Sequence, residues 1–134
     1  MNVLAVSIFS QVLLVDDNPV QLSVREAVLR TAGFQVSTAA TAETALDILR
    51  TLRDRIGVVV TDHLMPGCDG PELVQRIREG GEYLPVIVLS GLPEAFPEYE
   101  GLDVVFRPKP LPPVELIELV RSSLEETSRR RTAA

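Results

Sequence analysis

Carboxylate side chains follow two strand-forming runs of the sequence, at the point where each run ends. Asp16 and Asp17 come directly after residues 12–15, and Asp62 comes directly after residues 58–61. Short runs rich in valine and leucine are typical of strands that are buried on both faces. A carboxylate is costly to bury there unless it is paired or bound to a metal. These residues are therefore the first candidates for a functional site.

Two further polar residues stand at comparable places later in the chain. Ser90 follows the apolar residues 86–89, and Lys109 comes shortly after residues 104–106. In open sheets of parallel strands, ligands bind beyond the carboxyl ends of the strands. Each polar residue taken alone has an ordinary interpretation as a turn or loop residue. Their joint placement, after every predicted strand except the second, predicts a common site.

The combination of residue types indicates phosphoryl chemistry. Carboxylates that lie close together repel one another, and a divalent cation with oxygen ligands, typically Mg²⁺, removes that repulsion. Lys109 supplies a positive charge and Ser90 a hydroxyl donor, and such groups stabilise a transferring phosphoryl group. A carboxylate can itself be the covalent acceptor. Asp62, on the middle strand, is the best candidate for that role.

Alternating strand and helix patterns must position these residues. Strands are predicted at residues 12–15, 34–39, 58–61, 86–89 and 104–106. Helix starts are predicted at Pro19, Thr41, Pro71 and Pro112. This alternation predicts an α/β domain, a doubly wound five-stranded parallel sheet in the order 2-1-3-4-5 with helices on both faces.

Two helices of this arrangement have distinctive patterns. In the first helix, Val20, Val24 and Val28 keep helical spacing and form an apolar stripe. The fourth helix has only residues 94–100 available to it, and Pro97 lies inside them. Because proline removes a backbone donor and clashes with the preceding turn, we expect the fourth helix to be short or irregular.

The composition limits the classes of function. A net charge of −6 argues against nucleic-acid binding, and no apolar run approaches the ~20 residues of a membrane helix. The single cysteine, Cys68, excludes an internal disulfide and fits a cytoplasmic location. Residues 1–10 are predicted to be an N-terminal extension, either of the first strand or as a loose tail. Residues 127–134, with Arg129 to Arg131, are predicted to be a solvated C-terminal tail.

Four stretches of the sequence contain the candidate residues. They are VLLVDDNP at residues 12–19, TDHLMPGCDG at 61–70, LSG at 89–91 and RPKP at 107–110. Together they resemble the receiver domain of response regulators in two-component signalling. The resemblance covers residues 11–126. It implies Mg²⁺ as cofactor and a histidine kinase or a histidine phosphotransfer protein as partner.

The resemblance also implies an acceptor and a metal site. Asp62 would accept the phosphoryl group and would be a ligand of Mg²⁺. Asp17 would bind the same ion, with Asp16 assisting through water. The backbone carbonyl of Leu64 would complete the set of protein ligands.

The resemblance implies further roles on the other side of the acceptor. Ser90 would bind a phosphoryl oxygen, Gly91 would leave room for it, and Lys109 would pair with it. Phe106 stands where the family has its switch aromatic, although a plain core phenylalanine explains it equally well. The one histidine, His63, would point away from the strand ends if the strand geometry continues.

Two functions from different classes remain open at this point. The first is a phosphorylation-dependent switch or phosphorelay intermediate with no output domain, which catalyses phosphoryl transfer only to its own Asp62. The second is a Mg²⁺-dependent phosphatase or phosphotransferase with Asp62 as nucleophile. That chemistry generally needs a second carboxylate as general acid, whereas Leu64, two residues further on, is apolar. A single stoichiometric labelling event favours the switch, and steady release of phosphate favours the enzyme.

Overall fold

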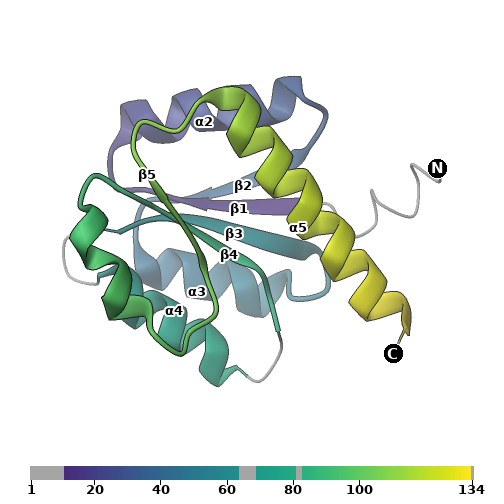
Figure 1. Cartoon of the computed structure of the whole chain (residues 1–134). Helices are drawn as coiled ribbons and strands as arrows, with labels where there is room; N and C mark the ends of the chain where they lie inside the picture. Colours follow the sequence, from purple (N-terminus) through teal and green to yellow (C-terminus); the bar gives the residue numbers. More distant parts are fainter. Residues whose placement is uncertain (1–10, 64–68, 81–82, 134) are drawn as a thin grey trace.

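Five parallel strands form the centre of the molecule (Figure 1). The computed structural model describes residues 11–63, 69–80 and 83–133. Its strands are β1 (Gln11–Val15), β2 (Gln35–Ala39), β3 (Ile56–Asp62), β4 (Val86–Ser90) and β5 (Val105–Pro108). They are hydrogen-bonded in the order β2-β1-β3-β4-β5, which confirms the predicted sheet.

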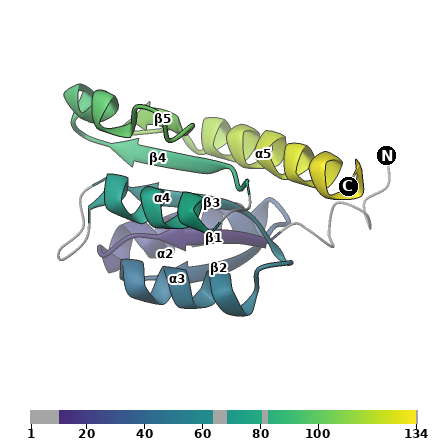
Figure 2. The same ribbon diagram turned by 90° about the horizontal axis from the view of Figure 1, so that it is seen from below.

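Helices cover both faces of this sheet. The described helices are α2 (Pro19–Thr31), α3 (Ala42–Thr51), α4 (Gly70–Glu79), the 3-10 helix η1 (Pro93–Tyr99) and α5 (Pro113–Ala133). Figure 1 shows α2 and α5 on one face and α3 and α4 on the other, and Figure 2 gives the view from below. In the part of the chain that the structure describes, no helix is long and apolar enough to cross a membrane.

Each face of the sheet has its own hydrophobic core, because alternate strand residues point to opposite faces. In β1, Val12 and Leu14 pack with residues of α2 and α5, whereas Leu13 and Val15 pack with residues of α3 and α4. The central strand β3 is buried along its whole length. Asp62 is the last residue of β3, so a strand packed on both faces holds it in place.

The fourth helical segment, η1, is short, as predicted. It is a seven-residue 3-10 helix with Pro97 inside it and no side-chain cap at its start. Only Ala95 and Tyr99 of this segment are buried, and the side chain of Phe96 is 57% exposed. A short segment with few buried side chains is weakly held in the fold.

The C-terminal residues differ from the predicted tail. Helix α5 continues past the expected domain boundary to Ala133. Thr127 is buried, and its hydroxyl donates to the carbonyl oxygen of Gly57 at 2.7 Å. Arg131 donates to the carbonyl oxygen of Ile56 at 3.0 Å. Polar contacts of this kind leave no apolar stripe in the sequence, so the sequence did not show that the helix continues.

The apolar stripe of α2 is not directed into the core. The side chains of Val20 and Val24 are 70% and 58% exposed, and the buried residue of α2 is Leu29. The two valines line a groove of about 480 Å³ between α2 and α5, together with Leu116. The periodicity correctly predicted a helix, but its apolar stripe faces this groove.

Candidate functional site

The carboxyl ends of β1, β3 and β4 meet at one edge of the sheet. In the strand register, Val15 pairs with Thr61 and Asp62 pairs with Leu89. A hollow of about 280 Å³ opens at this edge, lined by Asp62, His63, Ser90, Gly91, Leu92 and Lys109. Three predicted site residues from three separate parts of the chain therefore share one surface.

An acidic cluster lies beside this hollow. Carboxylate oxygens of Asp16, Asp17 and Asp62 all lie within 4.8 Å of one another. Asp16 is buried, and its carboxylate accepts a hydrogen bond from the backbone N–H of Asn18 at 2.9 Å and pairs with Arg25 at 2.7 Å. Burial raises the pKa of Asp16 and the charge of Asp62 adds to this, while the Asn18 hydrogen bond and Arg25 oppose it.

Lys109 approaches Asp62 from the loop that follows β5. Its ammonium group forms an ion pair with Oδ1 of Asp62, and its backbone N–H donates to the carbonyl oxygen of Ser90 at 2.8 Å. The ion pair is not aligned as a hydrogen bond. Among the described residues, Oδ1 of Asp62 is buried with no hydrogen-bond partner. The charge of this oxygen is balanced by Lys109, and no described residue donates a hydrogen bond to it.

Two residues of α2 that the sequence did not single out also belong to the site. The side-chain oxygen of Gln21 accepts from Nζ of Lys109 at 3.3 Å and from Nη2 of Arg25 at 3.4 Å. Arg25 in turn pairs with Asp16. The only signal in the sequence is their spacing of four residues in the helix that follows the acidic pair, which places both on one face.

The donor set of the acidic cluster fits Mg²⁺. Its three carboxylates offer only oxygen donors, which this ion prefers. Asp62 also has a buried oxygen, Oδ1, that lacks a hydrogen bond among the described residues. The remaining predicted ligand, the backbone carbonyl of Leu64, lies outside the described residues.

The hydroxyl group of Ser90 is engaged with its own loop. Its Oγ accepts from the backbone N–H of Leu92 at 2.9 Å and donates to the carbonyl oxygen of Leu92 at 3.2 Å. Ser90 is 1% exposed and lines the same hollow as Asp62. The orientation of this hydroxyl is therefore coupled to the chain that enters η1.

His63, which follows Asp62, contacts η1 and is not part of the acidic cluster. Its Nδ1 lies 2.6 Å from the hydroxyl oxygen of Tyr99. Burial raises the pKa of Tyr99 far above its usual value, so the hydroxyl stays protonated and can donate to Nδ1. The ring of Phe106, the predicted switch aromatic, lies 5.7 Å from that of Tyr99 and 5.4 Å from that of Phe96. Side-chain contacts thus connect the neighbour of Asp62 with both η1 and β5.

A family model matches most of the chain. The family model of the response regulator receiver domain matches residues 12–121. The chain therefore belongs to the response regulator receiver domains, as the sequence predicted. Receiver domains bind Mg²⁺ at an acidic pocket and interact with histidine kinases or phosphotransfer proteins.

Two curated relatives show how the chain compares with longer proteins. It is 39% identical over 119 residues to the C4-dicarboxylate transport transcriptional regulatory protein DctD of Pseudomonas aeruginosa, a match covering 87% of this chain and 25% of that protein. It is 33% identical over 124 residues to the response regulator MprA of Mycolicibacterium vanbaalenii, covering 88% of this chain and 52% of that protein. The chain thus spans a quarter to about half of these relatives.

Solved structures match over nearly the whole described fold. A response regulator receiver domain protein from Clostridium thermocellum superposes with a TM-score of 0.82 at 23% identity, covering 93% of this chain and 99% of that one. The Vibrio cholerae chemotaxis protein CheY4 superposes with a TM-score of 0.77 at 27% identity, covering 86% of this chain and 98% of that one. The first of these similarities concerns the fold alone.

Proposed function

We propose that this chain is a phosphorylation-dependent signalling switch or phosphorelay intermediate that accepts a phosphoryl group on Asp62. The observation that supports this most directly is the state of Oδ1 of Asp62. This oxygen is buried, paired in charge with Lys109 and without a hydrogen bond among the described residues. A carboxylate in that state is held in position and keeps a lone pair for bond formation.

The proposed phosphodonor is the phosphohistidine of a histidine kinase or a histidine phosphotransfer protein. A carboxylate oxygen of Asp62 forms the new O–P bond, the P–N bond to the donor histidine breaks, and the released imidazole takes up a proton. Lys109 stabilises the negative charge of the phosphoryl oxygens. Ser90 donates its hydroxyl to one of these oxygens, and Gly91 leaves room for the group.

The acidic cluster is the proposed Mg²⁺ site. Asp17 and Asp62 would bind the ion together with the carbonyl of Leu64, and Asp16 would assist through water. A bound Mg²⁺ supplies positive charge that offsets the charge on the phosphoryl oxygens. Arg25 holds the carboxylate of Asp16 at 2.7 Å, which keeps this side of the cluster in a fixed geometry.

The groove between α2 and α5 is the proposed docking site for the phosphodonor protein. It contains the exposed side chains of Val20 and Val24, and Lys109 also contributes to its lining. An apolar groove of this kind accepts the apolar face of a partner helix. A donor helix bound there would bring its phosphohistidine next to Asp62.

The hydroxyl of Ser90 supports a link between phosphorylation and output. It bonds to Leu92 in the described state, and the same hydroxyl is the proposed donor to the phosphoryl oxygen. It cannot keep its donation to Leu92 while donating to the phosphoryl group. Phosphorylation therefore changes the chain that enters η1, and Phe106, which packs against η1, is the proposed aromatic of this switch.

A phosphotransfer screen tests the proposed function. The protein is incubated with purified histidine kinases of its host, Mg²⁺ and labelled ATP, and the label on each protein is quantified. We expect transfer of one phosphoryl group per chain from a cognate kinase, and no transfer when Mg²⁺ is chelated. Steady release of phosphate from an unrelated phosphomonoester, without a labelled intermediate that builds up to one per chain, would support the enzyme alternative instead.

A further inference from the structure

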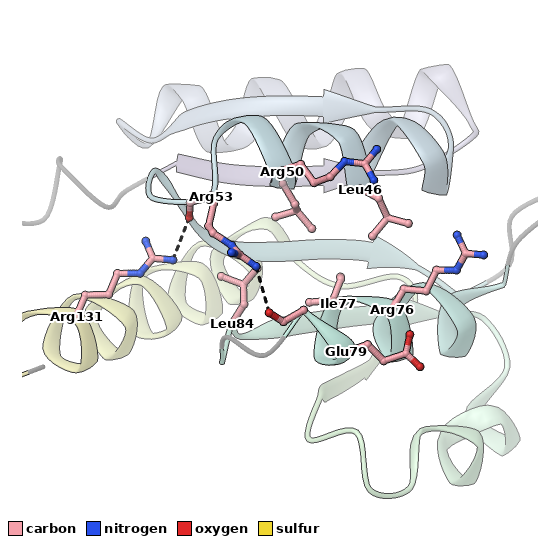
Figure 3. Close-up of a pocket in the computed structure, with 10 residues that line it drawn as sticks. Leu46, Arg50, Arg53, Arg76, Ile77, Glu79, Leu84 and Arg131 are labelled. Atoms are coloured by element: carbon pink, nitrogen blue, oxygen red, sulfur yellow. Dashed lines mark hydrogen bonds between the residues drawn. The ribbon is translucent and has the colours of Figure 1, made fainter.

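A second cleft lies at the opposite edge of the sheet from Asp62. It has a volume of about 480 Å³ and lies between α3 and α4, near the C-terminal ends of both helices (Figure 3). Parallel strands start at this edge, since Ile56 of β3 follows α3 and Val86 of β4 follows α4. None of the residues that line this cleft belongs to the proposed phosphorylation site.

The walls of the cleft are aliphatic. Leu46 and Leu49 line it from α3, and Ile77 lines it from α4. Leu84, just before β4, completes this apolar lining. Ile77 and Leu84 are 7% and 6% exposed, so they belong to the core and do not move freely. These side chains provide a fixed apolar surface between two helices, which is a common place for a small ligand.

The lining of the cleft is strongly basic. Among the residues that the structure describes, it includes the guanidinium groups of Arg50, Arg53, Arg76 and Arg131 and one carboxylate, that of Glu79. The chain as a whole has a net charge of −6, so a basic cleft is opposite in sign to the rest of the molecule. Figure 3 shows these side chains arranged from both helices and from α5 around the same space.

Contacts with backbone oxygens hold two of the arginines in place. Arg53 donates to the carbonyl oxygen of Gly80 at 3.1 Å, which connects the end of α3 with the end of α4. Arg131 donates to the carbonyl oxygens of Asp54 at 3.2 Å and of Arg53 at 3.3 Å. These hydrogen bonds hold both guanidinium groups at the edge of the cleft.

The two remaining arginines flank the other end of the cleft. Arg50 pairs with Asp47, but both side chains are largely exposed, at 76% and 66%, and such pairs are weak. Arg76 is exposed and lies on the facing helix. Both arginines are near helix C-termini and also balance the helix dipoles. That role alone does not require an apolar cleft between them.

We infer that this cleft binds a small amphipathic anion, with an aromatic or aliphatic body against the leucines and a phosphate or carboxylate between Arg50 and Arg76. The volume of about 480 Å³ lies within the range of small-molecule sites. Arginine pairs with planar carboxylates and with phosphates through two parallel hydrogen bonds. The combination of aliphatic walls and basic rim complements a ligand that has both parts.

A titration followed by amide chemical shifts tests this inference. Naphthyl phosphate is added to the full chain without Mg²⁺, and the same titration is repeated with naphthoate, with uncharged naphthol and with inorganic phosphate. We expect saturable shifts in residues 46–53 and 76–80 with naphthyl phosphate, with naphthoate or with both. The anion that binds more tightly shows whether the cleft prefers a phosphate or a carboxylate. Naphthol and inorganic phosphate, which each lack one part, are expected to bind at least about tenfold more weakly.

Two variants and one control locate the binding. Arg76→Glu reverses one charge of the rim, and Leu46→Trp fills the space between the helices without changing charge. Each is expected to weaken binding of the anion at least about tenfold, while Arg129→Ala, which removes an exposed arginine outside the lining, leaves it unchanged. Labelling by acetyl phosphate confirms that each variant is folded.

Any of three patterns of binding would overturn the inference. They are shifts confined to the α2–α5 groove, equal affinity for naphthol and for the anions, and binding that is insensitive to both Arg76→Glu and Leu46→Trp. A lack of saturable shifts with either anion would do the same.

Discussion

The two sides of Asp62 are built differently. On the side of β1, Asp16 is fixed by Arg25 and by the backbone of Asn18, and the next element is α2, a capped helix of 13 residues. On the side of β4, Ser90 leads into η1, a seven-residue 3-10 helix with no side-chain cap. The β1 side holds charges in place, whereas the β4 side leads into a short 3-10 helix that contains a proline.

This difference suggests a division between chemistry and response. Binding a metal and positioning a carboxylate require groups that do not move during the reaction. Transmitting the result requires a segment whose conformation changes at low cost in free energy. In this chain the two requirements are met on opposite sides of one residue, and each side can be perturbed separately.

The largest effect is expected from replacing Asp62, the residue that lies between the two sides. Asp62→Asn replaces the carboxylate by an amide, which is not a competent nucleophile, so labelling by acetyl phosphate and Mg²⁺ should be abolished. Intact-mass measurement of the labelled fraction checks this. The matched control is Asp47→Asn, an exposed residue of α3, which should be labelled like the wild type. Full labelling of Asp62→Asn would mean that another residue accepts the group.

The next effect concerns only the β1 side. Asp17 is exposed, so Asp17→Ala should leave the fold intact. The substitution removes a proposed direct ligand of Mg²⁺. Loss of a residue that only contacts a ligand lowers metal affinity by up to about a hundredfold, so we expect Asp17→Ala to lower Mg²⁺ affinity by at least about that factor. A Mg²⁺ titration followed by amide shifts measures it, with Asp47→Ala as control. Unchanged affinity would place the metal elsewhere.

A third prediction concerns only the β4 side. We expect phosphorylation to order η1, because this segment contains Pro93 and Pro97, which have no backbone donor, and only Ala95 and Tyr99 are buried. Amides from Glu94 to Gly101 should exchange rapidly in the unmodified protein and at least about tenfold more slowly with beryllofluoride and Mg²⁺. Amides of α2 serve as the internal reference. Strong protection of η1 before beryllofluoride is added would show that the segment is already ordered.

The same division explains what the sequence could and could not predict. The sequence predicted that Asp62, Ser90 and Lys109 lie together, as they do in the hollow, because polar residues at the ends of apolar strands are conspicuous and parallel strands bring their ends together. The sheet order followed from the same alternation. Gln21 and Arg25 were missed because their contribution depends on which face of α2 meets the strand ends, and periodicity does not determine that.

Other contacts had no pattern to reveal them. The burial of Thr127 against Gly57 and the contact of Arg131 with Ile56 join residues about 70 positions apart. The contact between His63 and Tyr99 likewise depends on how η1 packs over the sheet. Such polar contacts across long separations are set by tertiary packing, which a local pattern does not encode.

A smaller effect is expected for the lifetime of the phosphoryl group. Leu92 lines the hollow beside Asp62 and is 38% exposed, so it shields the site and offers no hydrogen bond to an attacking water. Leu92→Glu could orient that water, and we expect phosphate loss to become roughly tenfold faster. Decay of the label in the presence of Mg²⁺ measures the rate. Leu92→Met, which stays apolar, is the control, and an equal rate in both variants would contradict the shielding argument.

The smallest effect is expected from Tyr99→Phe, which should change the free energy of unfolding but not the labelling of Asp62. Tyr99→Phe removes the hydroxyl that lies 2.6 Å from Nδ1 of His63 and leaves that nitrogen buried without its partner. A loss of about 1 to 2 kcal/mol in the free energy of unfolding is expected, measured by urea denaturation. The matched control is Tyr83→Phe, because the hydroxyl of Tyr83 makes no hydrogen bond with the described residues, and its effect should be within about 0.5 kcal/mol. Labelling of Asp62 should be unchanged in Tyr99→Phe, while the amides of η1 exchange faster. If Tyr99→Phe lowers the labelled fraction of Asp62 as well as the free energy of unfolding, the two sides of Asp62 are not independent. The division between them is then wrong.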